Sequence, residues 1–424
     1  MGTSIELTVG GISLCYSKNH MGIDWGHLFQ EGDLIRRRTT AIDYDYYAEH
    51  PEEAEALAVA ELTFVRPLSR VLPRLALLGY SLEGARAEYE ELVEEASSFS
   101  RESDDAKLHL SFEEFCSLAN RFAISELADA YIEYDTRDRG VVAQGRYSAY
   151  AEEFSRVPWT EGSDSYWSEK SYLSSMVCIL RPESMLIIFG LNAKNADVEV
   201  EWEFGPIVHA GWVDQEAFHP GARRGQPILI ATEGASDARI LRRALDALRP
   251  DVADFFRFID GDERHHFWGT GNLVKFAEGL LRIDIQNRVL FLLDNDAEGV
   301  DAHGKLQRLA MPPNLRSMLL PSLDEFRNFP ALGPEGLNTC DINGRAVAIE
   351  CYLDLNLPQY PAARVVWSNY KKEIDAWHGA LEFKESYVKH FMAQESAGLS
   401  SGTYDASKLH NLLDALLAEA AQVA

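Results

Sequence analysis

An apolar run in the second half of the chain, VLFLL at residues 289–293, ends directly on Asp294 and Asp296. A strand that is apolar at every position is buried on both faces, which is typical of a parallel sheet covered by helices. The two aspartates would then lie close together at the rim of that sheet. Because neighbouring carboxylates repel, this arrangement requires a cation between them or a proton on one of them.

Strands and helices are expected to alternate from about residue 226 to residue 320. The segments PILIATEG, FFRFIDGD and LRSMLLP have the apolar runs of strands, and stretches with helical periodicity separate them. This alternation predicts an α/β fold with a doubly wound, mostly parallel sheet. Ligands of such sheets bind beyond the carboxyl ends of the strands, which is where Asp294 and Asp296 are expected.

The first half has a different pattern, which predicts a mixed α+β domain over residues 1–224. SIELTVGGISL contains two alternating runs separated by Gly10 and Gly11, which is typical of a hairpin. Residues 44–120 are expected to be helical, and SFEEFCSLANRFA starts at a serine with a capping-box glutamate. SMLIIFGL and DVEVEWEFGPIV are expected to be strands, the second antiparallel and half solvated. HPGARRGQ is expected to be a linker.

Composition bounds the kind of protein. A chain of 424 residues is longer than one hydrophobic core usually covers, so we expect at least two domains. The five cysteines are scattered and never spaced as C-x-x-C, which disfavours a disulfide framework and a cysteine zinc site. The sequence has no apolar run long enough for a membrane span and no signal-peptide pattern at its start. We therefore expect a cytoplasmic protein with reduced thiols and no membrane contact.

The net charge of −27 works against nonspecific attraction to nucleic acid, because the phosphates would be repelled. A nucleic-acid substrate would need a local basic patch, bound cations or a partner subunit. The short cluster of Arg223 and Arg224 is a candidate contact for phosphates, although a solvated loop explains it equally well.

Further acidic residues are expected at the same edge of the sheet. Glu233 falls at the tip of the strand in ATEGASDARIL, and Asp237 lies four residues on, near the start of the next helix. Together with Asp294 and Asp296 they offer only oxygen ligands, which suits a hard cation such as Mg²⁺ or Mn²⁺. For any one of these residues alone, a helix N-cap is an equally good explanation.

The segments ILIATEGASDARIL and VLFLLDNDAEG resemble the two signature motifs of the TOPRIM domain. Topoisomerases, bacterial primases and the overcoming-lysogenization-defect nucleases share that domain. The resemblance covers about residues 226–360 and implies that Glu233, Asp294 and Asp296 bind Mg²⁺ for phosphodiester chemistry. The cysteine usage argues against the zinc site of a primase.

Nucleases of the lysogenization-defect type add an acidic residue and a catalytic lysine downstream. The resemblance implies these roles for Glu350 in GRAVAIECYLDL and for Lys384 in GALEFKESYVKHF. We therefore expect a TOPRIM domain over residues 225–360 and a helical extension over residues 361–424 that completes the site. The alternatives are a surface arginine as the partner of Glu350 and an ordinary solvated position for Lys384.

SIELTVGGISL and GRAVAIECYL are also similar to segments of bacterial proteins described as HEPN/Toprim-associated, which are linked to antiphage defence. The Arg-(x)4–6-His signature of a HEPN ribonuclease is not evident in a suitable helix. The TOPRIM half is therefore expected to carry the chemistry.

The leading hypothesis is a nuclease of antiphage defence that cuts DNA or RNA with Mg²⁺ or Mn²⁺, using two ions. Glu233, Asp294 and Asp296 would be metal ligands, while Asp237 and Glu350 would serve the second ion. Glu233 is also a candidate general base.

Lys384 would neutralise the charge that builds on the scissile phosphate. One alternative function is a non-catalytic sensor or scaffold subunit with a degenerate TOPRIM domain. Another is a glycosyltransferase that binds Mn²⁺ through its D-x-D motif, which leaves Glu233 unexplained. A regulatory protein partner from a defence system and a homo-oligomer are both left open.

Overall fold

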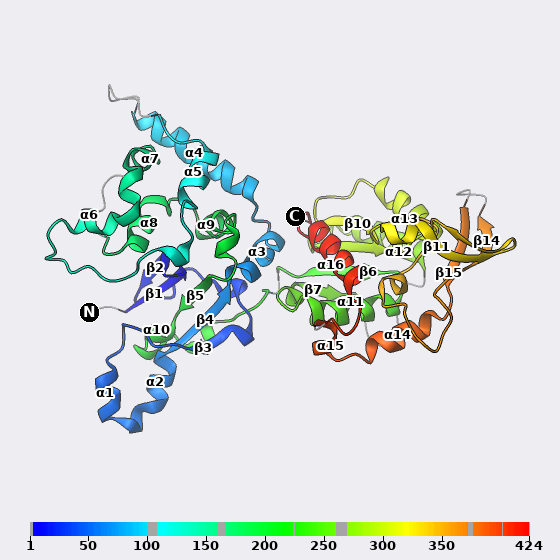
Figure 1. Ribbon diagram of the computed structural model, residues 1–424, viewed down its shortest axis with the longest axis horizontal. Helices are drawn as coiled ribbons and strands as arrows, with labels where there is room; N and C mark the ends of the chain where they lie inside the picture. Colours follow the sequence, from blue (N-terminus) through cyan, green and yellow to red (C-terminus); the bar gives the residue numbers. More distant parts are fainter. Residues whose placement is uncertain are drawn as a thin grey trace. The chain divides into compact units, whose positions relative to one another are not determined.

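The computed structural model describes residues 3–100, 108–159, 166–223, 225–259, 269–371, 376–400 and 402–423. Contacts within the chain divide it into two compact units, Met1–Gly221 and Ala222–Ala424. Each unit has its own sheet and its own hydrophobic core (Figure 1).

The N-terminal unit is built on a five-stranded antiparallel sheet in the order β2-β1-β5-β4-β3. Its strands are β1 (Ser4–Val9), β2 (Ile12–Lys18), β3 (Leu34–Arg36), β4 (Leu62–Pro67) and β5 (Glu199–Glu203). In β5 the buried Val200 and Trp202 alternate with more exposed glutamates. The antiparallel, half-solvated strand expected there is confirmed.

The predicted hairpin between β1 and β2 is also confirmed. Gly10 and Gly11 form its turn with φ angles of +55° and +81°, a region that favours glycine. A Cβ on Gly10 would lie 2.6 Å from the side chains of Ile124 and Val198. The turn therefore needs glycine for its backbone conformation and for its packing.

Helices surround this sheet (Figure 1). They are α1 (Tyr44–Glu49), α2 (Ala54–Ala60), α3 (Leu68–Leu77), α4 (Leu82–Ser100), α5 (Phe112–Ala119), α6 (Arg139–Gln144), α7 (Ala151–Ser155), α8 (Glu169–Val177), α9 (Pro182–Phe189) and α10 (Gly205–His209). Stacked aromatic rings fill the core beneath the sheet, with Phe29 and Trp202 each packed on Phe64 at centroid distances of 5.6 and 6.0 Å.

Two expectations for this unit are wrong. SMLIIFGL is part of helix α9 rather than a strand, because Pro182 occupies the first turn and starts a helix. A short apolar run cannot by itself separate a buried helix from a buried strand. In addition, the region 44–120 is not helical throughout, because strand β4 runs through it with Thr63, Phe64 and Arg66 buried.

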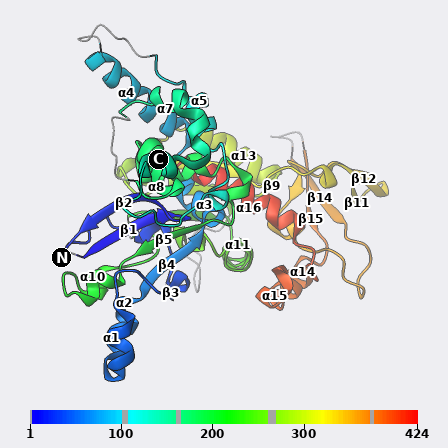
Figure 2. The same cartoon turned by 60° about the vertical axis from the view of Figure 1, so that its left-hand side comes forward.

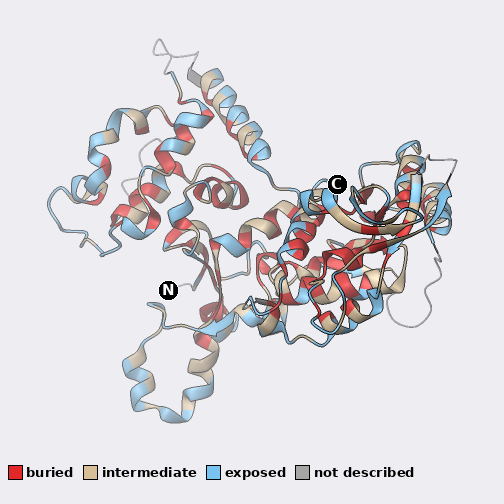
Figure 3. Ribbon diagram, turned by 45° about the vertical axis from the view of Figure 1, so that its right-hand side comes forward, coloured by how far each residue is buried: buried red, intermediate tan, exposed pale blue. Residues whose placement is uncertain are grey.

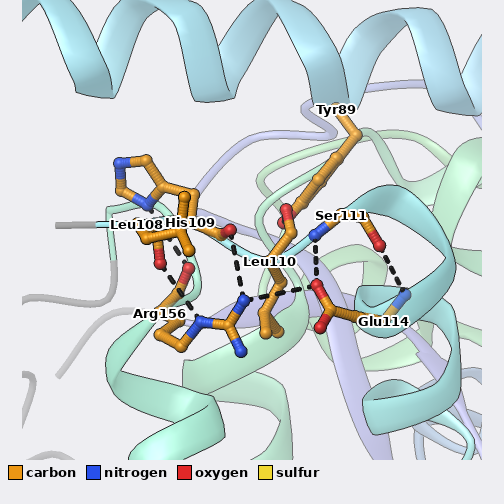
Figure 4. A network of polar contacts seen from close by, with 7 residues as sticks. All are labelled: Tyr89, Leu108, His109, Leu110, Ser111, Glu114 and Arg156. Atoms are coloured by element: carbon orange, nitrogen blue, oxygen red, sulfur yellow. Dashed lines mark hydrogen bonds and ion pairs between the residues drawn. The ribbon is translucent and has the colours of Figure 1, made fainter.

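A polar network joins α5 and α7 (Figure 4). The Arg156 side chain donates hydrogen bonds to the carbonyl oxygens of Leu108 and His109 and to Glu114 Oε2, at 3.1 to 3.5 Å. Glu114 and Ser111 also form the capping box that the sequence predicts at the start of α5. One arginine thus fixes the chain where it enters α5.

The C-terminal unit is built on a four-stranded parallel sheet in the order β10-β8-β6-β7. Its strands are β6 (Ile228–Thr232), β7 (Phe256–Phe258), β8 (Val289–Leu293) and β10 (Leu315–Leu319). The helices between them are α11 (Ala235–Leu248), α12 (Thr270–Arg282) and α13 (Ala297–Gln307). The predicted α/β fold with a parallel sheet is confirmed.

Helices cover both faces of this sheet. Alternate residues of β8, such as Phe291, pack with Leu273 of α12 and Leu306 of α13. On the other face α11 packs along β6 and beside the C-terminal helix α16 (Ser407–Ala420). All five residues of β8 are buried, and Figure 3 shows the buried strands between partly exposed helices.

The stretch 361–424 is not wholly helical as expected. It begins with β14 (Val365–Lys371) and β15 (Ala376–Leu381), which pair antiparallel and join a second sheet, β12-β11-β14-β15 (Figure 2). The other two strands are β11 (Phe329–Gly333) and β12 (Gly336–Cys340), and the helices α14 (Lys384–Met392), α15 (Ser396–Ser400) and α16 follow the hairpin. Valine, tryptophan and tyrosine favour the strand conformation here.

In the described ranges, no single helix is long and apolar enough to cross a membrane. Helices α8 and α9 reach that length and hydropathy only when taken together, and they meet at an angle of 118°.

Candidate metal centre

The candidate site lies at the point where the chain connections of the parallel sheet diverge. From β6 the chain crosses through α11 to β7, and from β8 it crosses through α13 to β10 on the opposite side. Because β6 and β8 are neighbours, their carboxyl ends form the topological switch point, where doubly wound sheets bind ligands.

Glu233 and Asp294 each follow their strand by one residue and meet at this point. Thr232 is paired with Leu292 in the sheet, so the two strand ends lie at the same level. The backbone N–H of Asp294 donates a hydrogen bond to Glu233 Oε1 at 3.1 Å. The sequence motifs sixty-one positions apart are therefore joined directly.

Asp296 follows on β9 (Asn295–Asp296), a two-residue strand that pairs with β13 (Ala346–Val347). The intervening Asn295 is buried and binds the backbone N–H of Gly344 and the hydroxyl of Ser322. Alternate residues of an extended chain point to opposite sides, so Asp294 and Asp296 share the other side.

Asp296 and Asp237 both cap helices, which is the alternative to metal binding that the sequence allows for each of them. Asp296 Oδ1 accepts the backbone N–H groups of Glu298 and Gly299 at 2.9 and 2.8 Å, at the start of α13. Asp237 Oδ2 accepts the N–H of Gly234 at 2.9 Å, in the first turn of α11. A carboxylate has about four lone-pair positions, so a cap leaves capacity for a cation.

Glu350 and Lys384 are brought together beside this group. Glu350 lies in the short 3₁₀ helix Ile349–Tyr352, and it is only 5 % exposed. Lys384 is the first residue of α14, and its Nζ lies 3.8 Å from Glu350 Oε1. The partner of Glu350 is therefore this lysine. The preceding Phe383 has a φ of +58°, a strained conformation for an aromatic residue.

The electrostatics tie these residues into one cluster. Burial raises the pKa of Glu233 to about 8, and the charges of Asp296 and Asp237 add to the effect. Burial likewise raises the pKa of Asp237 to about 7, with Glu350 as the main repelling charge. The pKa of Asp294 lies well above its ordinary value because of burial and the charges of its four neighbours. Without a cation, the carboxylate cluster must hold protons near neutral pH.

We use the term carboxylate cluster for the following residues: Glu233, Asp237, Asp294, Asp296 and Glu350. Their oxygen donors suit Mg²⁺ or Mn²⁺. Within the described ranges, no three Asp, Glu, His or Cys side chains converge closely enough to hold a metal ion as they stand. In the structure, one oxygen each of Asp237, Glu233 and Asp296 accepts a backbone N–H group. Cation binding would require side-chain rotations that bring carboxylate oxygens together.

One residue beside the carboxylate cluster was not predicted from the sequence. His378 of β15 places its Nδ1 3.7 Å from Asp296 Oδ2. A single histidine in a stretch that was expected to be helical carries no signal for this position. Only the pairing of β14 with β15 brings it to the site.

Arg223, one of the two candidate contacts for phosphates, lies at the opposite end of strand β6 from Glu233. Arg223 precedes the amino end of β6, and its backbone N–H donates to Gln226 Oε1 at 2.7 Å. Glu233 follows the carboxyl end of the same strand, and five residues of strand span about 16 Å. Arg224 lies outside the described residues. A role of either arginine in binding nucleic acid stays a prediction.

Comparison with known families identifies the family of the N-terminal part of the chain. Residues 1–226, just over half of the chain, match the family model described as HEPN/Toprim N-terminal domain 1. The chain therefore belongs to this family, as the likeness of SIELTVGGISL indicates. No curated protein and no solved structure matches the chain. Membership points to a nuclease-like or defence-associated role, and the matched residues end before Glu233.

Proposed function

We propose that this protein is a divalent-metal-dependent nuclease that hydrolyses phosphodiester bonds in DNA or RNA, as an effector of antiphage defence. Its active site would be a TOPRIM-type centre formed by the carboxylate cluster. The observation that carries the proposal is the hydrogen bond between Glu233 and the Asp294 amide at the switch point of a parallel sheet. It brings both acidic motifs to the place where such folds bind ligands.

The carboxylate cluster is costly for a protein that has no use for it. Buried charges of one sign destabilise a fold unless something neutralises them. The raised pKa values of Glu233, Asp237 and Asp294 express that cost. A divalent cation removes it, which favours a metal site over a degenerate scaffold.

The net charge of the C-terminal unit opposes a nucleic-acid substrate much less than the net charge of the whole chain does. Residues 1–221 hold 18 Lys and Arg against 39 Asp and Glu, a net charge of −21, whereas residues 222–424 hold 22 against 28, a net charge of −6. Five of those 28 belong to the carboxylate cluster. The repulsion of phosphates therefore comes mainly from the N-terminal unit.

The residues would divide the chemistry as follows. A bound cation would supply Lewis-acid stabilisation of charge on the phosphate. Glu233, Asp294 and Asp296 would hold it, with Asp237 and Glu350 beside them for a second ion.

Glu233 Oε1 accepts the Asp294 N–H, so Oε2 is the atom left to take a proton from the attacking water. Lys384 would turn from Glu350 to the scissile phosphate and donate hydrogen bonds to its oxygens. These roles use groups that already lie side by side.

Cleavage of plasmid DNA and of total RNA by the full chain with Mg²⁺ or Mn²⁺ tests the proposal. Glu233→Ala and Asp294→Ala should abolish cutting, while Asp324→Asn, at an exposed residue of the same unit, should leave it unchanged. Equal activity in all four proteins would place the chemistry elsewhere. A folded wild type that binds no divalent cation and cuts neither polymer would favour a sensor or scaffold.

A further inference from the structure

Asp296 has two oxygens with different surroundings. Oδ1 accepts two backbone N–H groups at the start of α13, those of Glu298 and Gly299. Oδ2 faces His378, whose Nδ1 is 3.7 Å away. Backbone hydrogen bonds thus fix Oδ1 of the carboxylate, while Oδ2 points toward the imidazole of His378.

The Nδ1 atom of His378 is buried and makes no hydrogen bond with any described residue. An unpaired buried nitrogen costs free energy unless it gains a partner. The nearby carboxylate oxygen is a strong acceptor, and a shift of under 1 Å would bring the pair within hydrogen-bond distance. The geometry of the pair points to a contact that tightens in a functional state.

The hairpin of β14 and β15 fixes the backbone at His378. Asn369 is its partner in the register of β14 and β15, and the hydroxyl of Ser368 donates to its carbonyl oxygen at 3.1 Å. On the opposite face, the ring of Trp367 covers Gly379 so closely that a Cβ there would lie 2.6 Å away. The strand pairing therefore fixes the backbone at His378, from which its side chain extends toward Asp296.

The strand β15 also lies where its histidine can act on the site. It packs beside β13 and α13, the two elements that flank Asp296. The neighbouring Trp377 points to the other face of the strand and is 39 % exposed. Of these two adjacent residues, only His378 faces the carboxylate cluster.

We propose that His378 is a positioning residue: its Nδ1–H binds Oδ2 of Asp296 and sets the orientation of that carboxylate toward a divalent cation. This inference rests on the proposed function, because it assumes that the carboxylate cluster is a metal site. Partners that hydrogen-bond to metal ligands fix their orientation, and losing one typically weakens metal binding by about 10- to 100-fold.

Titration calorimetry of the full chain with Mn²⁺ tests the proposal, with His378→Leu, His378→Asn and Trp377→Leu beside the wild type. His378→Leu removes the donor and should weaken Mn²⁺ binding by about 10-fold or more. His378→Asn keeps an N–H near the position of Nδ1 and should stay within about threefold of the wild type. Trp377→Leu, one residue away on the other face, should bind as the wild type does. Thermal unfolding of each protein identifies variants that do not fold.

Three results would overturn the inference. The first is unchanged Mn²⁺ binding in a folded His378→Leu variant, and the second is an equal loss in the leucine and asparagine variants. The third is a wild type that binds no Mn²⁺, which would contradict the proposed function as well. Because wild-type binding is measured separately from the variants, the two failures are distinguishable.

Discussion

The backbone N–H of Asp294 donates a hydrogen bond to Oε1 of Glu233 across the carboxyl ends of two neighbouring parallel strands. The contact leaves a partly buried glutamate beside a partly buried aspartate, with Asp296 and Asp237 close enough to repel both. Such a group is unfavourable without a cation or bound protons. Four consequences can be measured.

The stability of the metal-free protein should fall as pH rises from about 4.5 to about 8. Burial raises the pKa of Glu233 from 4.5 to about 8, so the folded state binds more protons than the unfolded state in that window. Stability therefore decreases with increasing pH and levels off below the unfolded pKa. Glu233→Gln cannot ionise, so at pH 8 its free energy of unfolding should exceed that of the wild type by roughly 2 to 4 kcal/mol. The variant should therefore unfold at a higher temperature.

Thermal unfolding with a chelator present, at several pH values, checks this. The exposed Asp324→Asn serves as the control and should follow the wild-type curve. A flat wild-type profile over the window would show that the carboxylate cluster is not repulsive.

Two glycines of the same helix should respond oppositely to alanine. A Cβ on Gly299 would collide with the carbonyl oxygen of Asp294, so Gly299→Ala must displace the D-x-D segment and should cost about 1 to 3 kcal/mol. A Cβ on Gly304 meets nothing closer than 3.8 Å, so Gly304→Ala should stabilise α13 by up to about 1 kcal/mol. Denaturant unfolding measures both, and equal effects would contradict the close packing at Asp294.

Lys384→Ala should lower the rate of cleavage by about 100-fold or more while the protein stays folded. The side chain is 54 % exposed, so its removal leaves little packing defect. Lys389→Ala, at an exposed position of the same helix, provides the matched control and should cleave normally. Equal cleavage rates for both variants would show that Lys384 is an ordinary solvated lysine with no part in cleavage.

How far the sequence predicts this molecule depends on how local each signal is. The apolar runs that end on Glu233 and Asp294 predict the parallel sheet and its acidic rim, because a strand buried on both faces has its own pattern. Short apolar runs are less informative, and α9 was expected to be a strand for that reason.

Long-range pairing accounts for what the sequence does not predict. Lys384 and Glu350 were placed at the site only through a family resemblance, since no local pattern links residues 34 positions apart. His378 was missed because its position depends on how β14 pairs with β15 and on where that hairpin packs.

Mn²⁺ titration calorimetry of the wild type and of Asp294→Ala tests the central claim most directly, because that claim is that the carboxylate cluster binds divalent cations. Performed at pH 7 in buffers with different heats of ionisation, it also counts the protons released on binding. We predict saturable binding with proton release in the wild type, because a cation displaces the protons of Glu233, Asp237 and Asp294. Asp294→Ala should lose that binding. Absence of binding in the wild type, or the same affinity in a folded Asp294→Ala variant, would contradict the account.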